Sequence, residues 1–181
     1  MPERVIRLIA SLSGTRKTRV DADDWQVMGL ADGEDPSQLP AGRVLVPLAL
    51  WKSRRHEFVA RGDVGVWLKP DEEPGELAGD VEQLAVIAVH FPKWGDGRGY
   101  SIGALLRTRH AFRGELRAFG DIGRDHLFDL ARCGFDAFVL PPARDPDDAV
   151  VAFGDFSLRY QGSVDDPAPL FRKRATAGRV Q

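Results

Sequence analysis

Short apolar segments of strand length alternate with helix-length segments through residues 43–142, and this alternation constrains the fold more than any other feature. The strand-like segments are 43–50, 64–68, 84–90, 115–119 and 137–140. The third of these, LAVIAVH, is almost wholly apolar, which is typical of a parallel strand buried on both faces. Strands separated by helices of about ten residues predict βαβ crossovers.

The alternation therefore predicts an α/β fold with a mainly parallel sheet of about five strands and helices on both faces. A flavodoxin-like winding is favoured, and a fragment related to a (β/α) barrel is the second alternative. The expected helices are 52–60, 76–83, 101–110, 124–133 and 147–153, with Ser101 as an N-cap and Gly134 as a left-handed C-terminal cap.

The flanking segments are less regular. Residues 4–10 and 18–28 are expected to be short strands that add an antiparallel edge to the sheet, and residues 156–161 are expected to be a further edge strand. We expect residues 1–165 to form a single α/β domain around the organised core 43–142. The polar segment 166–181 is expected to be a mobile C-terminal tail.

Composition narrows the class of protein. The single cysteine, Cys133, cannot form an internal disulfide or hold a metal cluster alone, and its place at a helix C-terminus predicts an inert thiol with a raised pKa. The net charge of −2 argues against a nucleic-acid-binding protein. No apolar segment approaches the roughly 20 residues of a membrane span, and the first residues do not resemble a signal peptide. A cytoplasmic protein without a metal site or a membrane partner is expected.

Two polar, glycine-rich loops follow consecutive predicted strands. They are FPKWGDGRGYS, residues 91–101, and GDIGRDH, residues 120–126. Ligands of parallel α/β sheets bind beyond the carboxyl ends of the strands, and consecutive strands place their loops on one edge. The candidate ligand or partner site is therefore Lys93, Trp94, Asp96, Arg98, Tyr100, Ser101, Arg117, Asp121, Arg124 and Asp125.

The first loop suits an anion or phosphate group, because its glycines free the backbone and a helix N-terminus follows. Lys93 and Arg98 add positive charge, and Trp94 could stack on a planar ligand or anchor a protein. The spacing matches neither a dinucleotide fingerprint nor a Walker loop. A tight turn with solvated side chains is the structural alternative.

The second loop offers an acid–base pair or an anion site. Its structural alternative is that Asp121 caps the helix and Arg124 pairs with Asp125 or Asp96. Arg117, inside a strand, must reach a carboxylate, and Asp96 and Asp121 are its candidate partners. His90, at the end of the central strand, is expected to be a hydrogen-bonded core histidine rather than a ligand.

Three ordered blocks resemble a known family. They are FPKW-x-DGR-x-YS, GELRA-x-GD followed by RD, and RCGFDAF, and VLVPLALW and VGVWL-x-P extend the resemblance over roughly residues 40–160. The chain resembles the bacterial family called domain of unknown function 934. Members are described as involved in sulfite reduction, sometimes as oxidoreductases, because their genes lie beside sulfite reductase.

Three functions stay open here, the first two implied by the resemblance and the third by the residues of the two loops. The favoured one is an accessory protein of assimilatory sulfite reduction that binds the sulfite reductase hemoprotein or its electron donor through the two loops. The second is an oxidoreductase with a loop-bound flavin or nicotinamide cofactor. The third is a binding protein for a small anion or a nucleotide. Self-contained redox chemistry is disfavoured by the lack of a cysteine pair or a dinucleotide fingerprint.

Overall fold

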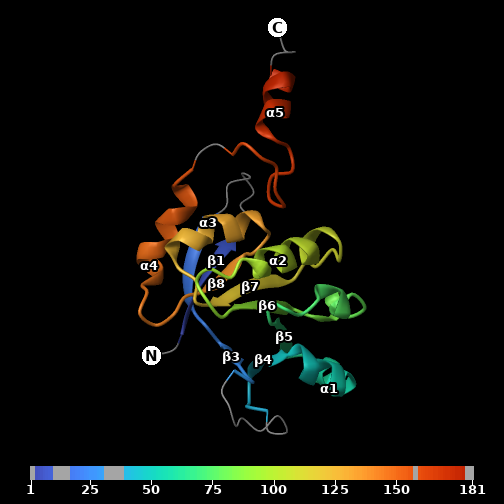
Figure 1. The fold of residues 1–181 in the computed structure, drawn as a ribbon. Helices are drawn as coiled ribbons and strands as arrows, with labels where there is room; N and C mark the ends of the chain where they lie inside the picture. Colours follow the sequence, from blue (N-terminus) through green and yellow to red (C-terminus); the bar gives the residue numbers. More distant parts are fainter. Residues whose placement is uncertain (1–2, 10–16, 31–38, 157–158, 178–181) are drawn as a thin grey trace.

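The computed structural model describes residues 3–9, 17–30, 39–156 and 159–177, and its centre is one eight-stranded mixed sheet (Figure 1). The strands are β1 Arg4–Ile9, β2 Lys17–Ala22, β3 Trp25–Val27, β4 Arg43–Pro47, β5 Val64–Leu68, β6 Val86–Phe91, β7 Glu115–Gly120 and β8 Ala137–Val139. The helices are α1 Leu48–Arg61, α2 Arg98–Thr108, α3 Arg124–Arg132, α4 Pro146–Ala149 and α5 Leu170–Ala177, with 3₁₀ turns η1 Pro74–Leu77, η2 Val81–Gln83 and η3 Val150–Gly154. The α/β class is confirmed, but the sheet has eight strands rather than about five and is mixed rather than mainly parallel.

The winding of the sheet is sequential. The strand order is β2-β1-β8-β7-β6-β5-β4-β3, and every pair from β3 to β8 is parallel. Each parallel strand thus lies beside the next one in the chain. The flavodoxin-like winding was wrong, because it requires the strand order to reverse within the sheet. Sequential order is the arrangement of a (β/α) barrel fragment, the second alternative.

The helices cover one face of the sheet, not both as predicted. The larger core cluster joins that face to α1, α2 and α3 through Trp51, Leu106 and Leu130, among others. Alternate strand residues, such as Val66 on β5 and Val89 on β6, point into it. Crossovers of one hand between neighbouring strands place successive helices on the same side, which explains the one-sided layer.

The opposite face is concave and has a smaller core of its own. Trp25, Leu45, Trp67, Val86, Ala88 and Phe119 form this cluster, and no helix contributes to it. The sheet curls into a half-barrel far enough for side chains of distant strands to meet. The Asp23 carboxylate, beside β3, lies 2.6 Å from the Arg117 guanidinium on β7, four strands away.

The first strands complete the sheet on both edges. β1 pairs antiparallel with β2 and with β8, so the expected antiparallel edge is present. The single strand expected at 18–28 is two strands, β2 and β3, at opposite edges of the sheet. The strand expected at 156–161 is absent from the described residues of that segment, and 157–158 lie outside the described part.

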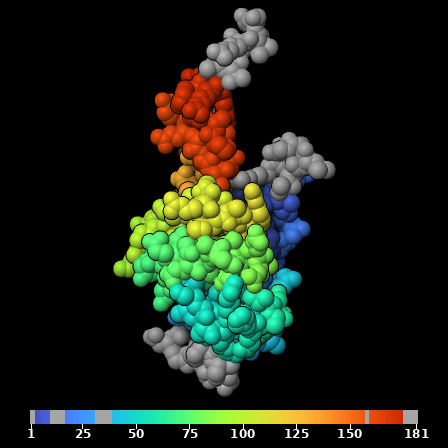
Figure 2. Space-filling model, turned by 90° about the vertical axis from the view of Figure 1, so that its right-hand side faces the viewer, coloured from blue at the N-terminus to red at the C-terminus, as the bar shows by residue number. Residues whose placement is uncertain are grey.

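The C-terminal segment carries a helix where a tail was expected. α5 and the residues before it extend away from the body beyond α3 (Figures 1 and 2). Contacts near its base hold it: the Arg132 guanidinium donates to the carbonyl of Gln161 over 2.8 Å, and the Val164 amide to the carbonyl of Arg132 over 3.0 Å. The mobility of residues 166–181 stays a prediction.

Candidate functional site

The two predicted loops meet at the carboxyl edge of β6 and β7, as their positions after consecutive strands predicted. The Trp94 amide donates to the Asp121 carboxylate over 2.9 Å, and the Asp121 amide donates to the Phe91 carbonyl over 2.7 Å. Asp121 therefore links the loops rather than capping α3, whose N-cap is Gly123. We call segments 92–97 and 120–126, together with Arg144, the loop junction.

His126 makes the second link between the loops. Its Nδ1 accepts from the Gly123 amide over 3.1 Å, and its Nε2 lies 3.0 Å from the Trp94 carbonyl. Both contacts are satisfied by the neutral tautomer with hydrogen on Nε2, because Nδ1 must accept while Nε2 donates. The ring also meets the Trp94 ring edge to face, with centroids 4.2 Å apart. His126 thus contacts both the backbone carbonyl and the ring of Trp94.

Arg144 covers the tryptophan from the loop that follows β8. Its guanidinium carbon lies 4.5 Å from the Trp94 ring centroid, and Nη2 donates to Asp121 over 3.3 Å. The Nη1 atom of Arg144 is buried and has no hydrogen-bond partner. Even so, 45% of the Trp94 surface remains exposed. A large aromatic side chain is thus held rigidly and left accessible.

Gly123 is required by this packing. A Cβ atom at this position would lie 2.0 Å from Nη1 of Arg144 and 2.7 Å from Cζ3 of Trp94. Gly95, in the first loop, would meet nothing within 4 Å. The two glycines therefore provide a matched pair of positions: an added methyl group would disturb the junction at Gly123 and would contact nothing at Gly95.

Asp96 and Arg98 form a pair within the first loop. Nε and Nη2 of Arg98 donate to the two Asp96 oxygens over 2.9 and 2.7 Å, and the Arg98 amide donates to Oδ1 over 3.2 Å. These bonds lower the pKa of Asp96 to about 2. α2 begins at Arg98, so Ser101 lies within the helix and is not its N-cap. The Asp96 carboxylate already occupies the helix N-terminus at which a phosphate was expected.

The other candidates of the first loop differ in exposure. Lys93 is exposed, and its carbonyl closes a turn with the Asp96 amide over 3.0 Å. Ser101 is exposed on α2. Tyr100 is half-buried against Phe91, and burial raises the pKa of its phenol to about 12. Lys93 can therefore contact a partner, whereas Tyr100 mainly packs α2 on β6.

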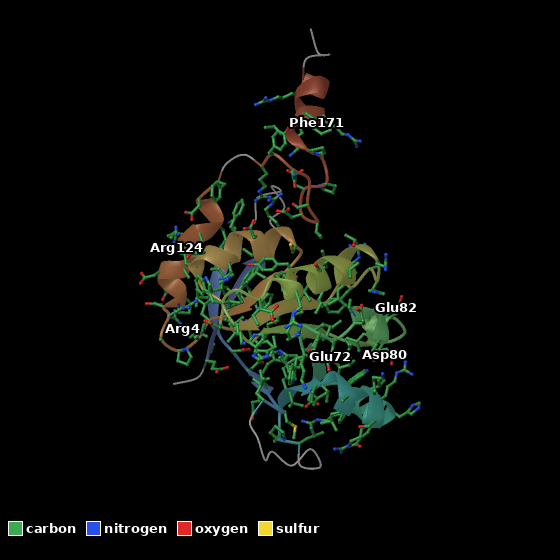
Figure 3. The ribbon with its side chains drawn as sticks, viewed as in Figure 1. Arg4, Glu72, Asp80, Glu82, Arg124 and Phe171 are labelled. Carbon is green, nitrogen blue, oxygen red and sulfur yellow. The ribbon has the colours of Figure 1, made fainter. Side chains whose placement is uncertain are left out.

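Arg124 and Asp125 begin α3. Arg124 donates to both oxygens of Asp155 over 2.8 Å, while Asp125 is 4.0 Å from it and 71% exposed. Asp155, not Asp96, is thus its main partner. In Figure 3, Arg124 and Arg4 lie on one side of the molecule, and Asp80 and Glu82 on the other.

Arg117 does not join the loop junction. It is 1% exposed and points to the concave face, where it donates to Asp23 over 2.6 Å and to Glu115 over 2.6 and 3.0 Å. The expected partners, Asp96 and Asp121, were wrong, because Arg117 lies near the amino-terminal half of β7 and the loops follow the other end. Arg7 extends the network by donating to Glu115 over 2.8 Å.

The two remaining side chains singled out in the sequence are packed. His90 stacks on Phe119 and meets the edge of Trp67, and burial lowers its pKa. The ring is only partly buried on the concave face, and no hydrogen bond joins it to the described residues, so the expected hydrogen-bonded core position is not observed. Burial raises the pKa of the Cys133 thiol, in the direction that the sequence predicted.

Several residues of the junction were not singled out in the sequence. Arg144 follows β8, so the rule that selected the first two loops could also have selected this third one. Asp155 has no local signal, because its partner Arg124 is 31 residues away. Asp23, the partner of Arg117, lies 94 residues from it.

The described residues contain neither a cluster suited to a metal ion nor a membrane-spanning helix. No group of three or more histidine, cysteine, aspartate or glutamate side chains there could hold a metal ion. Among the same residues, no helix has the length and apolar character needed to cross a bilayer.

Comparison with known families gives a match. The model of a family described as a bacterial protein of unknown function, DUF934, matches residues 65–171. No curated protein matches the chain. The matched range contains both loops and Arg144, so the whole loop junction lies within it.

Proposed function

The chain belongs to the DUF934 family of bacterial proteins of unknown function, and from this premise we propose that it is an accessory protein that docks on another protein through the loop junction. The partner we propose is the sulfite reductase hemoprotein or its electron donor. This choice of partner depends on the resemblance described for the sequence, whereas the docking role depends on the geometry.

The exposed, immobilised ring of Trp94 carries the proposal. Tryptophan and arginine are enriched among residues that dominate protein–protein binding energy. Here His126 and Arg144 pack against the ring, and Asp121 and His126 hydrogen-bond to the backbone of Trp94, before any partner arrives. A side chain already ordered loses little entropy on binding, so its apolar surface is available for affinity.

The charges of the junction favour docking over a phosphate-binding loop. Arg98 is neutralised by Asp96, Arg124 by Asp155, and Arg144 lies against Asp121. A phosphate would have to displace the Asp96 carboxylate from the α2 N-terminus. This geometry counts against the oxidoreductase with a loop-bound flavin or nicotinamide, and against the small-anion protein.

Binding should be measured between the purified chain and the sulfite reductase hemoprotein, and separately its electron donor, by biolayer interferometry. We expect a specific complex that Trp94→Ala weakens about 30-fold or more, the effect of losing a dominant interface residue. Tyr160→Ala removes another aromatic side chain, 72% exposed, and should leave affinity unchanged.

A second pair of variants tests the geometry rather than the side chain. Gly123→Ala should weaken the complex, because the added methyl displaces Arg144 and Trp94, whereas Gly95→Ala should not. Absence of any complex with either protein, or equal affinity of the Trp94→Ala variant, contradicts the proposal. A flavin or nucleotide released in stoichiometric amount on denaturation would favour the oxidoreductase instead.

A further inference from the structure

A pocket of about 510 Å³ opens on the concave side of the half-barrel, next to the carboxyl ends of β7 and β8. Its walls come from opposite parts of the curled sheet. Val27 and Leu30, in and after β3, face Phe119 on β7 and Val139 on β8. Pockets of this size hold small organic molecules, and ligands of parallel sheets bind at this edge.

Most of the wall is apolar. Val27, Leu30, Phe119, Val139, Leu140, Pro141 and Pro142 supply it. Leu30 is 46% exposed, and Val27 and Val139 are partly exposed, so apolar surface faces the solvent-filled pocket. Covering such surface with the body of a ligand is favourable in proportion to its area.

The charged groups of the pocket exclude anions. Arg117 forms the floor, but all three of its guanidinium nitrogens donate to the carboxylates of Asp23 and Glu115. Asp23 and Glu115 therefore compensate this cation, and Arg7 also pairs with Glu115. An entering carboxylate or phosphate would meet a guanidinium whose charge these carboxylates already compensate, with the negative charge of Asp23 beside it.

The rim of the pocket is acidic. Glu3 and Asp121 lie there, and Asp121 is shared with Trp94 and Arg144 of the loop junction. Glu3 is exposed, and its carboxylate makes no hydrogen bond or ion pair with the described part of the chain. We propose that the concave pocket binds a small organic cation, with an apolar or aromatic body against the Phe119 wall and an ammonium group at Glu3. This inference is independent of the docking role of the loop junction.

Three probes with one apolar body and different charges test the pocket. They are phenethylamine, the neutral 2-phenylethanol and the anionic hydrocinnamate, titrated into the ¹⁵N-labelled full chain. We expect phenethylamine to shift the amide signals of Phe119, Gly120, Val139 and Leu140 in the millimolar range. The neutral probe should bind more weakly, and the anion weakest of all.

Variants of residues at the rim test whether these residues cause the preference of the pocket for a cationic probe. Glu3→Gln should weaken phenethylamine binding about two- to fivefold and leave 2-phenylethanol unchanged, as for one partly exposed ion pair. Leu30→Lys should weaken it further by repulsion. Both side chains are exposed, so the fold is retained, and Glu82→Gln on the far side is the matched control.

Each outcome of these titrations either supports or overturns the proposal. Binding in the order cation, neutral, anion that depends on Glu3 supports the proposal. If none of the probes shifts the four amides at about 10 mM, or if hydrocinnamate binds as well as phenethylamine, the proposal is overturned. A loss of partner docking in Trp94→Ala leaves this result untouched, so the two proposals fail independently.

Discussion

At the residue scale, the buried cation Arg117 is held by one carboxylate two residues away in the sequence and by another 94 residues away. Arg117 is 1% exposed, and the side chain of Asp23 is 2% exposed. A guanidinium removed from water is costly unless carboxylates compensate it, and Asp23 and Glu115 do so here. The pair also joins the β3 side of the half-barrel to β7. The charge network therefore holds the curl of the sheet as well as filling its concave side.

We expect Arg117→Met to lower the free energy of unfolding by about 3–5 kcal/mol, because it leaves the buried Asp23 carboxylate without its cation. Arg19→Met is the control, since Arg19 is 61% exposed in its pair with Asp21 and its loss should cost at most about 1 kcal/mol. Urea denaturation of both variants measures the difference. Equal losses would show that burial of Arg117 contributes nothing to stability.

At the scale of elements, α2 packs through a glycine on the turn between α3 and β8. Gly103 is buried in α2, and a Cβ atom there would lie 2.3 Å from the ring of Phe135, which lies in that turn and is fully buried. The helix and this ring can approach closely only because that methyl group is missing. The first loop leads directly into α2, so the position of this helix also sets the loop junction.

Gly103→Ala should therefore destabilise the protein by about 1–3 kcal/mol through overpacking, although alanine is the better helix former. Gly79→Ala, where the new methyl group meets nothing within 4 Å, should change stability by less than about 0.5 kcal/mol. Thermal and urea unfolding compare them. A neutral Gly103→Ala variant would mean that Phe135 moves aside without cost.

Elements of the central region were predictable, because the periodicity of apolar residues is local. Strand β5 has the predicted bounds, and Gly134 adopts the predicted left-handed conformation with φ +99°. The start of α2 was placed three residues late, since the Asp96 carboxylate already binds the Arg98 amide. The break between β2 and β3 was missed, because Asp23 there serves a partner 94 residues away.

The site was predictable to a similar extent. Adjacency of the two loops follows from strand order alone, and the contact of Trp94 with Asp121 agrees with it. The charge pairs cannot be derived from strand order, because a sequence with many arginines and aspartates allows many combinations. Asp155 and Arg144 were thus missed as partners of Arg124 and Asp121. The predicted winding of the sheet was wrong for a related reason: the periodicity of apolar residues defines strands but not their order in the sheet.

At the scale of the whole molecule, stability should depend on pH through His90. Burial lowers its pKa from the ordinary 6.5, so the folded chain keeps this ring neutral where the unfolded chain binds a proton. The contribution of the neutral His90 ring to the free energy of unfolding is present in full above pH 6.5 and is lost as the pH falls toward the folded pKa. We expect the free energy of unfolding to fall as the pH drops below about 6.5, and His90→Phe to reduce that slope.

A second pH window provides the internal control. The pKa of Asp96 is lowered to about 2, so its contribution is present above the unfolded value near 3.8 and is lost as pH falls toward 2. His90→Phe should leave this acid limb in place. Urea denaturation over both windows separates the groups. An unchanged slope near pH 6 in the variant would rule out His90 as its source.

The pairing of β1 with β8 has a consequence for synthesis on the ribosome. Val5 lies beside Val139, so the first strand must wait for a partner 134 residues behind it. At 5–20 residues per second, that wait lasts roughly 7–27 s. Meanwhile each later parallel strand can align on the one translated before it. The nascent chain can thus build its sheet from β3 onward, while the earliest-made hairpin is the last to attach.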